Sequence, residues 1–328
     1  MKKRVISGLI YLFILVAMFA SKIVVNIYTK NIGDLIFDTL IWFFAIVGTY
    51  EITRAFGDSM TKAQRVITFI FAGIVIPACG LAEYFFGYGL HVTCVCFFAL
   101  CVTLLSLLVF RHDETTLENI GSSLLAAVYP SLLLCLLVLA NHIGEPPVLA
   151  GFDKVIGGTE QAVFNSDLAI LFIFTISPLS DVFAFFFGIT LKKVFPQKLA
   201  PTLSPNKTVI GFIGGLIGGA ISGVAVYFVY TMVLSLIGRA EVGWMFENVG
   251  LWLLVYVAIG LLAALATSFG DLVESCIKRK KGLKDMGNIM PGHGGVLDRI
   301  DGTIFATVAV YVCFAFINLI LWFVALPH

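Results

Sequence analysis

Four carboxylates lie near the ends of two apolar stretches in the C-terminal part of the chain. Asp271 and Glu274 are three residues apart, and Asp298 and Asp301 have the same spacing. Residues three or four apart share one face of a helix, so each pair projects to one side if its segment is helical. Carboxylate oxygens suit Mg²⁺, which typically takes one or two of them and leaves its other positions for water and substrate phosphates. We therefore treat these four residues as candidate metal ligands.

The segment 270–301, which contains both acidic pairs, is rich in cations. Its candidate catalytic cations are Lys278, Arg279, Lys284 and Arg299. Such side chains hold phosphate oxygens through charge-assisted hydrogen bonds. Ser275 lies on the helix face of Asp271, and the Pro-Gly-His-Gly-Gly stretch at 291–295 lets the backbone approach a ligand closely, because glycine lacks a side chain. Together these parts predict a metal-assisted phosphoryl or nucleotidyl transfer site.

Each part of this segment has a plainer interpretation when it is taken alone. A basic cluster beside a membrane helix usually binds only anionic headgroups, and a glycine-rich turn is usually only a turn. Here the acidic pairs, the cations and the turn all fall within 32 residues. Solvation explains that combination poorly, and the combination favours a site.

The segment 270–301 resembles the signature of the phosphatidate cytidylyltransferases, also called CDP-diacylglycerol synthases. That signature runs Ser-x-apolar-Lys-Arg, four residues, Lys-Asp, a small residue, and later Pro-x-His-Gly-Gly-apolar-x-Asp-Arg-apolar-Asp. The matching residues here are Ser275, Ile277, Lys278, Arg279, Lys284, Asp285, Gly287, Pro291, His293, Gly294, Gly295, Val296, Asp298, Arg299, Ile300 and Asp301. The visible departure is Met290, where Leu, Ile or Phe is usual, and methionine keeps the volume and apolarity of that position.

A second stretch resembles the family's upstream region, in which an Asp begins a helix and a Ser-Pro-x-Lys-Thr turn follows. The candidate residues in this stretch are Asp181, Ser204, Lys207 and Thr208. Family members often continue with Trp-Glu-Gly, where this chain reads Val209-Ile210-Gly211, and no role is carried over to Ile210. The resemblance covers about residues 175 to 325, whereas the first 140 residues match only as generic membrane helices.

The resemblance implies a membrane enzyme and homodimer that uses CTP, phosphatidic acid and Mg²⁺, and it allows a second cation. It matches Asp271 and Asp298 to the family's metal-binding aspartates. A phosphate oxygen of phosphatidic acid would attack the α-phosphorus of CTP in line, and pyrophosphate would leave. The residues expected to contact substrate are Asp181, Ser204, Lys207, Thr208, Ser275, Gly294 and Gly295. His293 is expected to be an acid, a phosphate donor or a loop anchor, and Asp181 is either a helix cap or a site residue.

Other functions are weighed against this one. An enzyme that uses CTP on an isoprenoid lipid phosphate, or as the phosphoryl donor of a lipid kinase, is separated by its products: pyrophosphate indicates nucleotidyl transfer, and CDP indicates a kinase. A transporter is disfavoured because the sequence has no inverted repeat or matching pair of broken helices. A CDP-alcohol phosphotransferase is disfavoured because its Asp-Gly-x-x-Ala-Arg pattern ends here at Asp301-Gly302-Thr303. Nucleic acid is not an expected partner.

Membrane helices must position these residues. Of 328 residues, 59% are hydrophobic and 12% are charged, whereas soluble domains have about 25% charged residues. Apolar runs of about 17 to 25 residues have the length that a helix needs to cross a bilayer. Continuous runs of this kind form helices rather than the alternating strands of a barrel. We predict an all-α bundle with nine spans, at about 5–25, 35–50, 66–86, 90–110, 122–141, 167–190, 209–237, 249–269 and 302–326.

Lysine and arginine predict the orientation, because they favour cytoplasmic loops. With the N-terminus inside, 17 of the 21 lie on the cytosolic side, and only Lys22, Lys30, Lys154 and Arg239 lie on the other. The basic loops 191–208 and 270–301 then share the cytosolic face of an expected bacterial plasma membrane, and the C-terminus is outside. We divide the chain into N-terminal membrane helices, 1–140, and a catalytic membrane domain, 141–328.

Three further features are interpreted as structural. The seven cysteines lie mostly in apolar runs without a CxxC pair, as small core residues do. A small-xxx-small stripe predicts close helix packing or dimerisation rather than chemistry, and its members are Gly214, Gly215, Gly218 and Gly219. The polar loop 142–166, with His142 and Glu145, is interpreted as solvated and extracytoplasmic rather than as a site.

Overall fold

The structure is a computed structural model that describes residues 2–144, 164–236, 248–290 and 294–325. Within these ranges, nine helical spans are long and apolar enough to cross a membrane. Large apolar side chains are exposed on their surfaces, including Phe13 at 73%, Phe98 at 67% and Phe185 at 70%, as expected for side chains that face lipid rather than water. The predicted all-α membrane bundle is confirmed, and the chain is an integral membrane protein.

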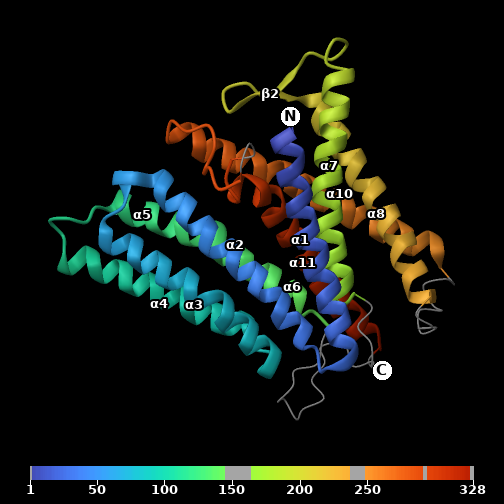
Figure 1. Ribbon diagram of the computed structural model, residues 1–328, viewed down its shortest axis with the longest axis horizontal. Coiled ribbons are helices and arrows are strands. Elements are labelled where there is room, and N and C mark those ends of the chain that lie inside the picture. Colours follow the sequence, from blue (N-terminus) through green and yellow to red (C-terminus); the bar gives the residue numbers. More distant parts are fainter. Residues whose placement is uncertain (1, 145–163, 237–247, 291–293, 326–328) are drawn as a thin grey trace. The chain divides into compact units, whose positions relative to one another are not determined.

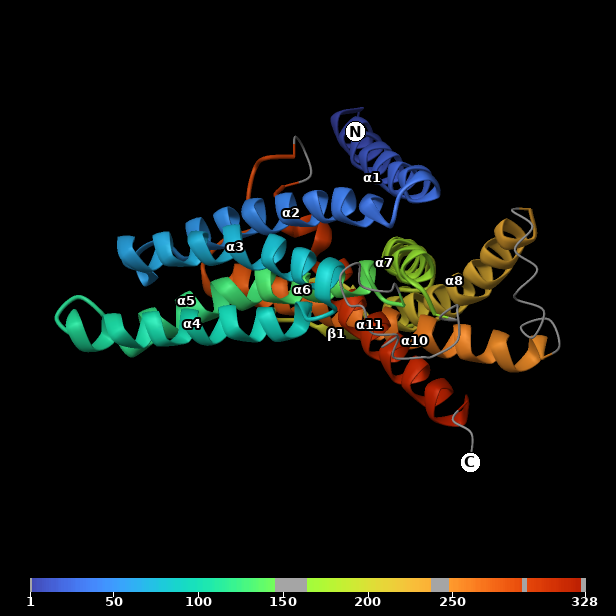
Figure 2. The same ribbon diagram turned by 90° about the horizontal axis from the view of Figure 1, so that it is seen from below.

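The spans are formed by ten α-helices and a short π-helical segment (Figures 1 and 2). The helices are α1 (Lys2–Tyr28), α2 (Ile32–Phe56), α3 (Lys62–Phe86), α4 (Gly89–Phe110), α5 (Leu117–Ala126), α6 (Leu133–Asn141), α7 (Ser166–Thr190), α8 (Val209–Leu236), α10 (Val249–Lys280) and α11 (Leu297–Ala325). The π-helical segment η2 (Ala127–Leu132) joins α5 and α6 into one span. A 3₁₀ turn, η1 (Gly57–Ser59), follows α2, and two strands, β1 (Lys198–Ala200) and β2 (Ser204–Thr208), form a hairpin before α8.

All nine predicted spans are present, and two of them differ at an end that carries the motif. Helix α10 continues to Lys280, beyond the predicted end at 269, and α11 begins at Leu297 rather than at 302. An apolar run ends where charged residues begin, whereas the backbone hydrogen bonds of a helix continue through charged residues. The extra turns therefore carry the acidic pairs on helices, as the spacing of those residues requires.

The chain folds as two compact units. Unit 1 contains Met1–Ser166, Lys278–Ile300 and Asn318–His328, and unit 2 contains Asp167–Ile277 and Asp301–Ile317. In unit 1, α1 to α4 pack in sequence order, and α5, η2 and α6 pack against α2 and α3 (Figure 1). The functional division at residue 140 stays a prediction.

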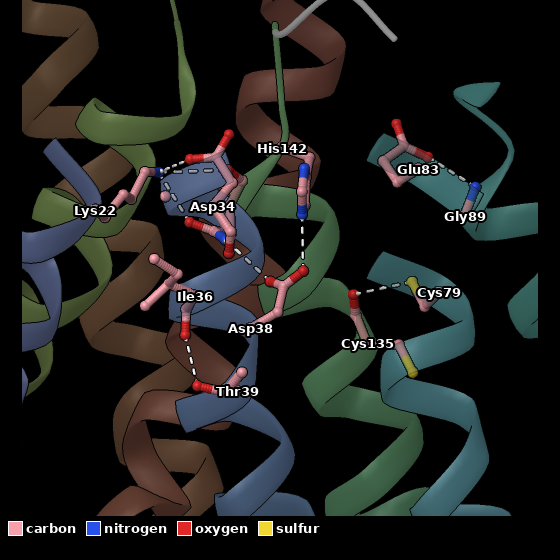
Figure 3. A network of polar contacts seen from close by, with 12 residues as sticks. Lys22, Asp34, Ile36, Asp38, Thr39, Cys79, Glu83, Gly89, Cys135 and His142 are labelled. Atoms are coloured by element: carbon pink, nitrogen blue, oxygen red, sulfur yellow. Dashed lines mark hydrogen bonds and ion pairs between the residues drawn. The ribbon is translucent and has the colours of Figure 1, made fainter. Parts of the chain in front are cut away.

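Local signals in unit 1 set where its helices begin and end. Helix α3 begins at a capping box, in which Thr61 Oγ1 accepts from Gln64 N at 3.3 Å and the Gln64 side chain accepts from Thr61 N at 2.8 Å. It ends at Gly87, whose φ of 70° is in the left-handed region. The short turn to α4 is held by Glu83, which accepts a hydrogen bond from Gly89 N at 2.8 Å (Figure 3).

In unit 2, the predicted glycine stripe is buried between helices. A Cβ at Gly214 would lie 2.5 Å from the Phe187 side chain on α7, and one at Gly219 would lie 2.5 Å from the Gly260 carbonyl oxygen on α10. Helix α8 therefore approaches α7 and α10 more closely than any side chain at these positions allows. The packing interpretation is confirmed.

A buried polar cluster ties three helices of unit 1 together (Figure 3). Lys22 on α1 is fully buried, donates to Asn141 Oδ1 at 2.8 Å, and pairs with Asp34 on α2 at 3.2 Å. Asp38 accepts from Asn141 Nδ2 at 2.9 Å and lies 2.8 Å from His142 Nε2. His142 is only 4% exposed, so the interpretation of a solvated residue there is wrong; Glu145 lies outside the described residues.

The cysteines are all unpaired, but only Cys79 and Cys135 are buried. Cys94 is exposed on α4, where an apolar helix surface faces lipid. The interpretation as core residues is therefore right for two of the seven.

Candidate active site

The motif segment folds around the carboxylate of Asp298. Asp298 Oδ2 accepts hydrogen bonds from the backbone N–H groups of Gly295 at 2.7 Å and Met286 at 2.9 Å. Its Oδ1 accepts one from Lys278 Nζ at 2.8 Å, and the two side chains are 6% and 14% exposed. A carboxylate and a lysine at opposite ends of the motif are thus joined directly, in the part of the chain assigned to unit 1.

The motif turn closes just before Asp298. Met290 N donates to the Gly294 carbonyl at 2.9 Å, which brackets 291–293. Gly294 has a φ of 88° and a Cβ there would lie 2.7 Å from Asp298 Oδ2, so both conformation and space require glycine. His293 lies outside the described residues, and its three expected roles stay predictions.

Glu51 on α2 is a site residue that sequence reasoning missed. It is 1% exposed, and its carboxylate accepts hydrogen bonds from Val296 N at 2.9 Å and Leu297 N at 2.8 Å. A Cβ at Gly287 would lie 2.7 Å from Glu51 Cδ, and one at Gly295 would lie 2.5 Å from it. The group that comes closest to the backbone at these glycines is therefore Glu51. The available signal was an acidic residue at the end of an apolar span.

In unit 2, the hairpin brings Lys207 to Asp271. Strand β1 pairs antiparallel with β2, with Lys198 opposite Thr208, and Lys207 Nζ forms an ion pair with Asp271 Oδ2 on α10. The Ser275 hydroxyl lies 3.4 Å from Asp271 Oδ1. Two regions that the sequence identified separately thus meet, and the Asp271 side chain remains 36% exposed.

The other upstream candidates have identifiable structural surroundings. Thr208 directly precedes α8, and its Oγ1 accepts from Gly211 N at 3.1 Å, as a helix N-cap does. Ser204 begins β2. Asp181 is exposed inside α7, fifteen residues after the start at Ser166, so the helix-cap interpretation is wrong.

The remaining carboxylates are not arranged as a cage. Glu274 is fully buried on α10, and Asp301 Oδ1 accepts from Gly302 N at 2.7 Å. Across the described ranges, no three His, Cys, Asp or Glu side chains form a group that could hold a metal ion. Mg²⁺ that is bound by one or two carboxylates, with substrate phosphates completing its shell, does not require such a group.

Two aspartates retain capacity to bind Mg²⁺ in this way. A carboxylate has about four lone-pair positions, and Asp298 uses three of them. Asp271 is partly exposed beside Lys207. The convergence of Asp271 with Asp298 stays a prediction.

Three of the four candidate cations of the motif lie on the surface. Arg279, Lys284 and Arg299 are exposed, whereas Lys278 is held by Asp298. Arg279 also lies 3.4 Å from the Leu283 carbonyl oxygen. Exposed guanidinium and ammonium groups at the ends of membrane helices are suited to a polyanionic ligand from water.

Comparison with known proteins agrees with this chemistry. The sequence profile of the Cytidylyltransferase family matches residues 2–317. The phosphatidate cytidylyltransferase of Staphylococcus saprophyticus is 41% identical over 136 residues, which is 42% of this chain and 45% of that protein. Those of Staphylococcus haemolyticus and Staphylococcus aureus are each 40% identical over 136 residues, with the same coverage. These alignments span less than half of each relative's length, whereas the family match spans nearly all of the chain. The chain therefore belongs to the cytidylyltransferase family.

Proposed function

We propose that this protein transfers the cytidylyl group of CTP to phosphatidic acid, which gives CDP-diacylglycerol and pyrophosphate. The observation that carries the proposal is the folded motif, in which Asp298 holds Lys278 and the backbone of the turn at the end of two membrane helices. The names of the staphylococcal relatives support the same reaction.

The side chains have separable tasks in this reaction. A phosphate oxygen of phosphatidic acid forms a bond to the α-phosphorus of CTP, and the bond to the β-phosphate oxygen breaks, so that pyrophosphate leaves with the electron pair. Arg279, Lys284 and Arg299 bind phosphate oxygens and stabilise the charge on the transferring group. Asp271 and Asp298 are the residues that would hold Mg²⁺, which supplies Lewis-acid polarisation of the phosphates.

We place the N-terminus and the motif loop in the cytosol and the C-terminus outside, at a bacterial plasma membrane. Two contacts within unit 1 support the predicted alternation of the spans. Lys281 donates to Ser59 Oγ at 2.6 Å, which pairs two segments predicted to be cytosolic. Lys22, which is counted on the outer side, donates to Asn141 Oδ1 at the C-terminal end of α6, next to the loop predicted to be outside.

We also propose that the protein forms a homodimer. The glycine stripe of α8 is buried within the chain, so a dimer would use another surface.

The reaction is tested with purified protein, phosphatidic acid, Mg²⁺ and CTP labelled either at the α- or the γ-phosphate. We expect α-label in the extracted lipid and γ-label in pyrophosphate. Lipid that carries γ-label would identify a kinase instead. Polyprenyl phosphate as the competing acceptor tests the isoprenoid alternative, and absence of label from any lipid would contradict the proposal.

A further inference from the structure

Helix α2 and the η1 turn that follows it contact both ends of the motif loop. At the beginning of the loop, Lys281 donates to Ser59 Oγ at 2.6 Å and its ammonium lies 4.8 Å from the centre of the Phe56 ring. At its end, Val296 and Leu297 donate to Glu51. The hydrogen-bond partners are more than 200 residues apart in the chain, so neither contact follows from local folding.

We propose that Glu51 is a positioning residue for cytidylyl transfer, which sets the start of α11 and thereby the orientation of Asp298 and Arg299. This inference rests on the proposed function. The first N–H groups of a helix have no partner within the helix, and a carboxylate beside them also interacts favourably with the helix dipole. Glu51 supplies this cap from another helix, one and two residues before Asp298.

The same contact affects where phosphate binds. A helix N-terminus with unpartnered N–H groups is a ready anion site, and Glu51 occupies the groups of Val296 and Leu297 with its buried carboxyl group. A nucleotide phosphate is excluded from this position. It is left to the exposed cations of the motif, Arg279, Lys284 and Arg299.

The glycines of the motif show how tightly the loop fits against Glu51. Gly287 and Gly295 both lie where any Cβ would collide with the Glu51 carboxyl group. A carboxylate that served only as a charge would not need two close backbone approaches from one loop. The fit therefore fixes both the position of α2 against the loop and the register of the turn within unit 1.

The test compares two buried carboxylates of α2. Glu51→Gln keeps the size of the side chain but replaces one acceptor oxygen with an NH₂ group that cannot accept from an N–H donor. The matched control is Asp34→Asn, which perturbs the Lys22 cluster on the same helix, about 25 Å away along α2 at 1.5 Å per residue. Each protein is purified in detergent, and its kcat, KM for CTP, melting temperature and amide hydrogen exchange are measured.

We expect Glu51→Gln to lower kcat/KM for CTP by about 10-fold or more per folded molecule, because charge-assisted hydrogen bonds are lost. Exchange of the amides in 286–297 should become faster, while that in α8 stays unchanged. Asp34→Asn should lower the melting temperature and leave kcat and KM unchanged. A Glu51→Gln protein with wild-type kinetics and wild-type exchange in 286–297 would overturn the inference.

A second pair of variants covers the case in which Glu51→Gln does not fold. Gly287→Ala pushes against Glu51 from the loop side, whereas Gly73→Ala on α3 enters open space and is the control. We expect Gly287→Ala to lower kcat/KM for CTP per folded molecule and to speed amide exchange in 286–297, because its Cβ displaces the Glu51 carboxyl group. The same kinetics and exchange as Gly73→Ala would contradict the proposed fit. A wild-type protein that made no CDP-lipid would sink the proposed function, while the exchange measurement would still decide the role of Glu51 in the loop.

Discussion

Lys278 and Asp298 form an ion pair, with 2.8 Å between Nζ and Oδ1, across a motif segment of 20 residues. Because both side chains are nearly buried, the charge of each residue is balanced by the charge of the other. Asp298 therefore stabilises the loop, and the proposed binding of a metal ion by Asp298 has to be tested separately from this role.

Asp298→Asn should lower turnover by about 100-fold or more, because metal and cation clamps supply much of the barrier lowering in this chemistry. It should also lower the melting temperature, since breaking a buried ion pair costs about 3–5 kcal/mol, and the Asn amide oxygen recovers part of this. Specific activity and folded yield are measured together at several Mg²⁺ concentrations. Partial recovery at high Mg²⁺ supports a metal ligand, whereas near-normal activity per folded molecule would show a structural residue only.

Lys207→Met should leave the melting temperature almost unchanged. Its ion pair with Asp271 is 25% and 36% exposed, and exposed pairs contribute about 0–1 kcal/mol. Activity should fall, because Asp271 loses the cation beside it and the phosphates lose a binding group. Thermal unfolding and initial rates measured on one preparation check this. A large loss of stability with normal rates would assign the pair to folding of the hairpin.

The stability of unit 1 should depend on the protonation of His142. Burial disfavours the charged ring, but the contact and hydrogen bond with Asp38 outweigh it and raise the pKa of His142 above its ordinary value. A raised pKa in the folded state stabilises the protein below the unfolded pKa of about 6.5, and this contribution is lost as pH rises through the folded pKa. We expect the melting temperature to fall as pH rises above about 6.5. A His142→Gln variant should lose this pH-dependent contribution to stability. An equal fall of the melting temperature with pH in both proteins would exclude His142 as its source.

The orientation predicts which loops are reached from outside the cell. In a background without native cysteines, a cysteine at Lys30 should react with an impermeant maleimide in intact cells, and one at Lys198 should react only after permeabilisation. Labelling in the reverse pattern would invert the topology. Equal labelling at both positions before permeabilisation would show that the cells were not intact, so an internal cytosolic marker is probed in parallel.

Helix spans and motif residues were predictable because their signals are local. Apolar runs marked all nine spans, whereas the helical ends that carry Asp271 with Glu274 and Asp298 with Asp301 extend beyond the predicted spans. The helix-cap alternative for Asp181 came from the family resemblance, in which an Asp begins a helix. In this chain the apolar residues continue on both sides of Asp181, and α7 continues with them.

Glu51 and Lys22 could not be assigned from sequence, because their partners are distant. Glu51 meets residues 245 and 246 positions away, and Lys22 meets Asn141, 119 positions away. An isolated charge at the end of an apolar span suggests a functional residue without indicating its partner. Gly287 and Gly295 indicate that another group approaches the backbone closely at these positions. Only the fold shows that this group is the Glu51 carboxylate.

The glycine seam between α8 and α10 has a mechanical consequence for a lipid substrate. Gly219 and Gly223 on α8 lie so close to Gly260 and Tyr256 on α10 that no Cβ fits between the backbones. Such a contact has many van der Waals neighbours at short range and loses them steeply as the helices separate. An acyl chain would have to force this seam apart to pass. The seam is therefore closed to an acyl chain, and a diacyl substrate, under the proposed function, would have to reach the site by another route.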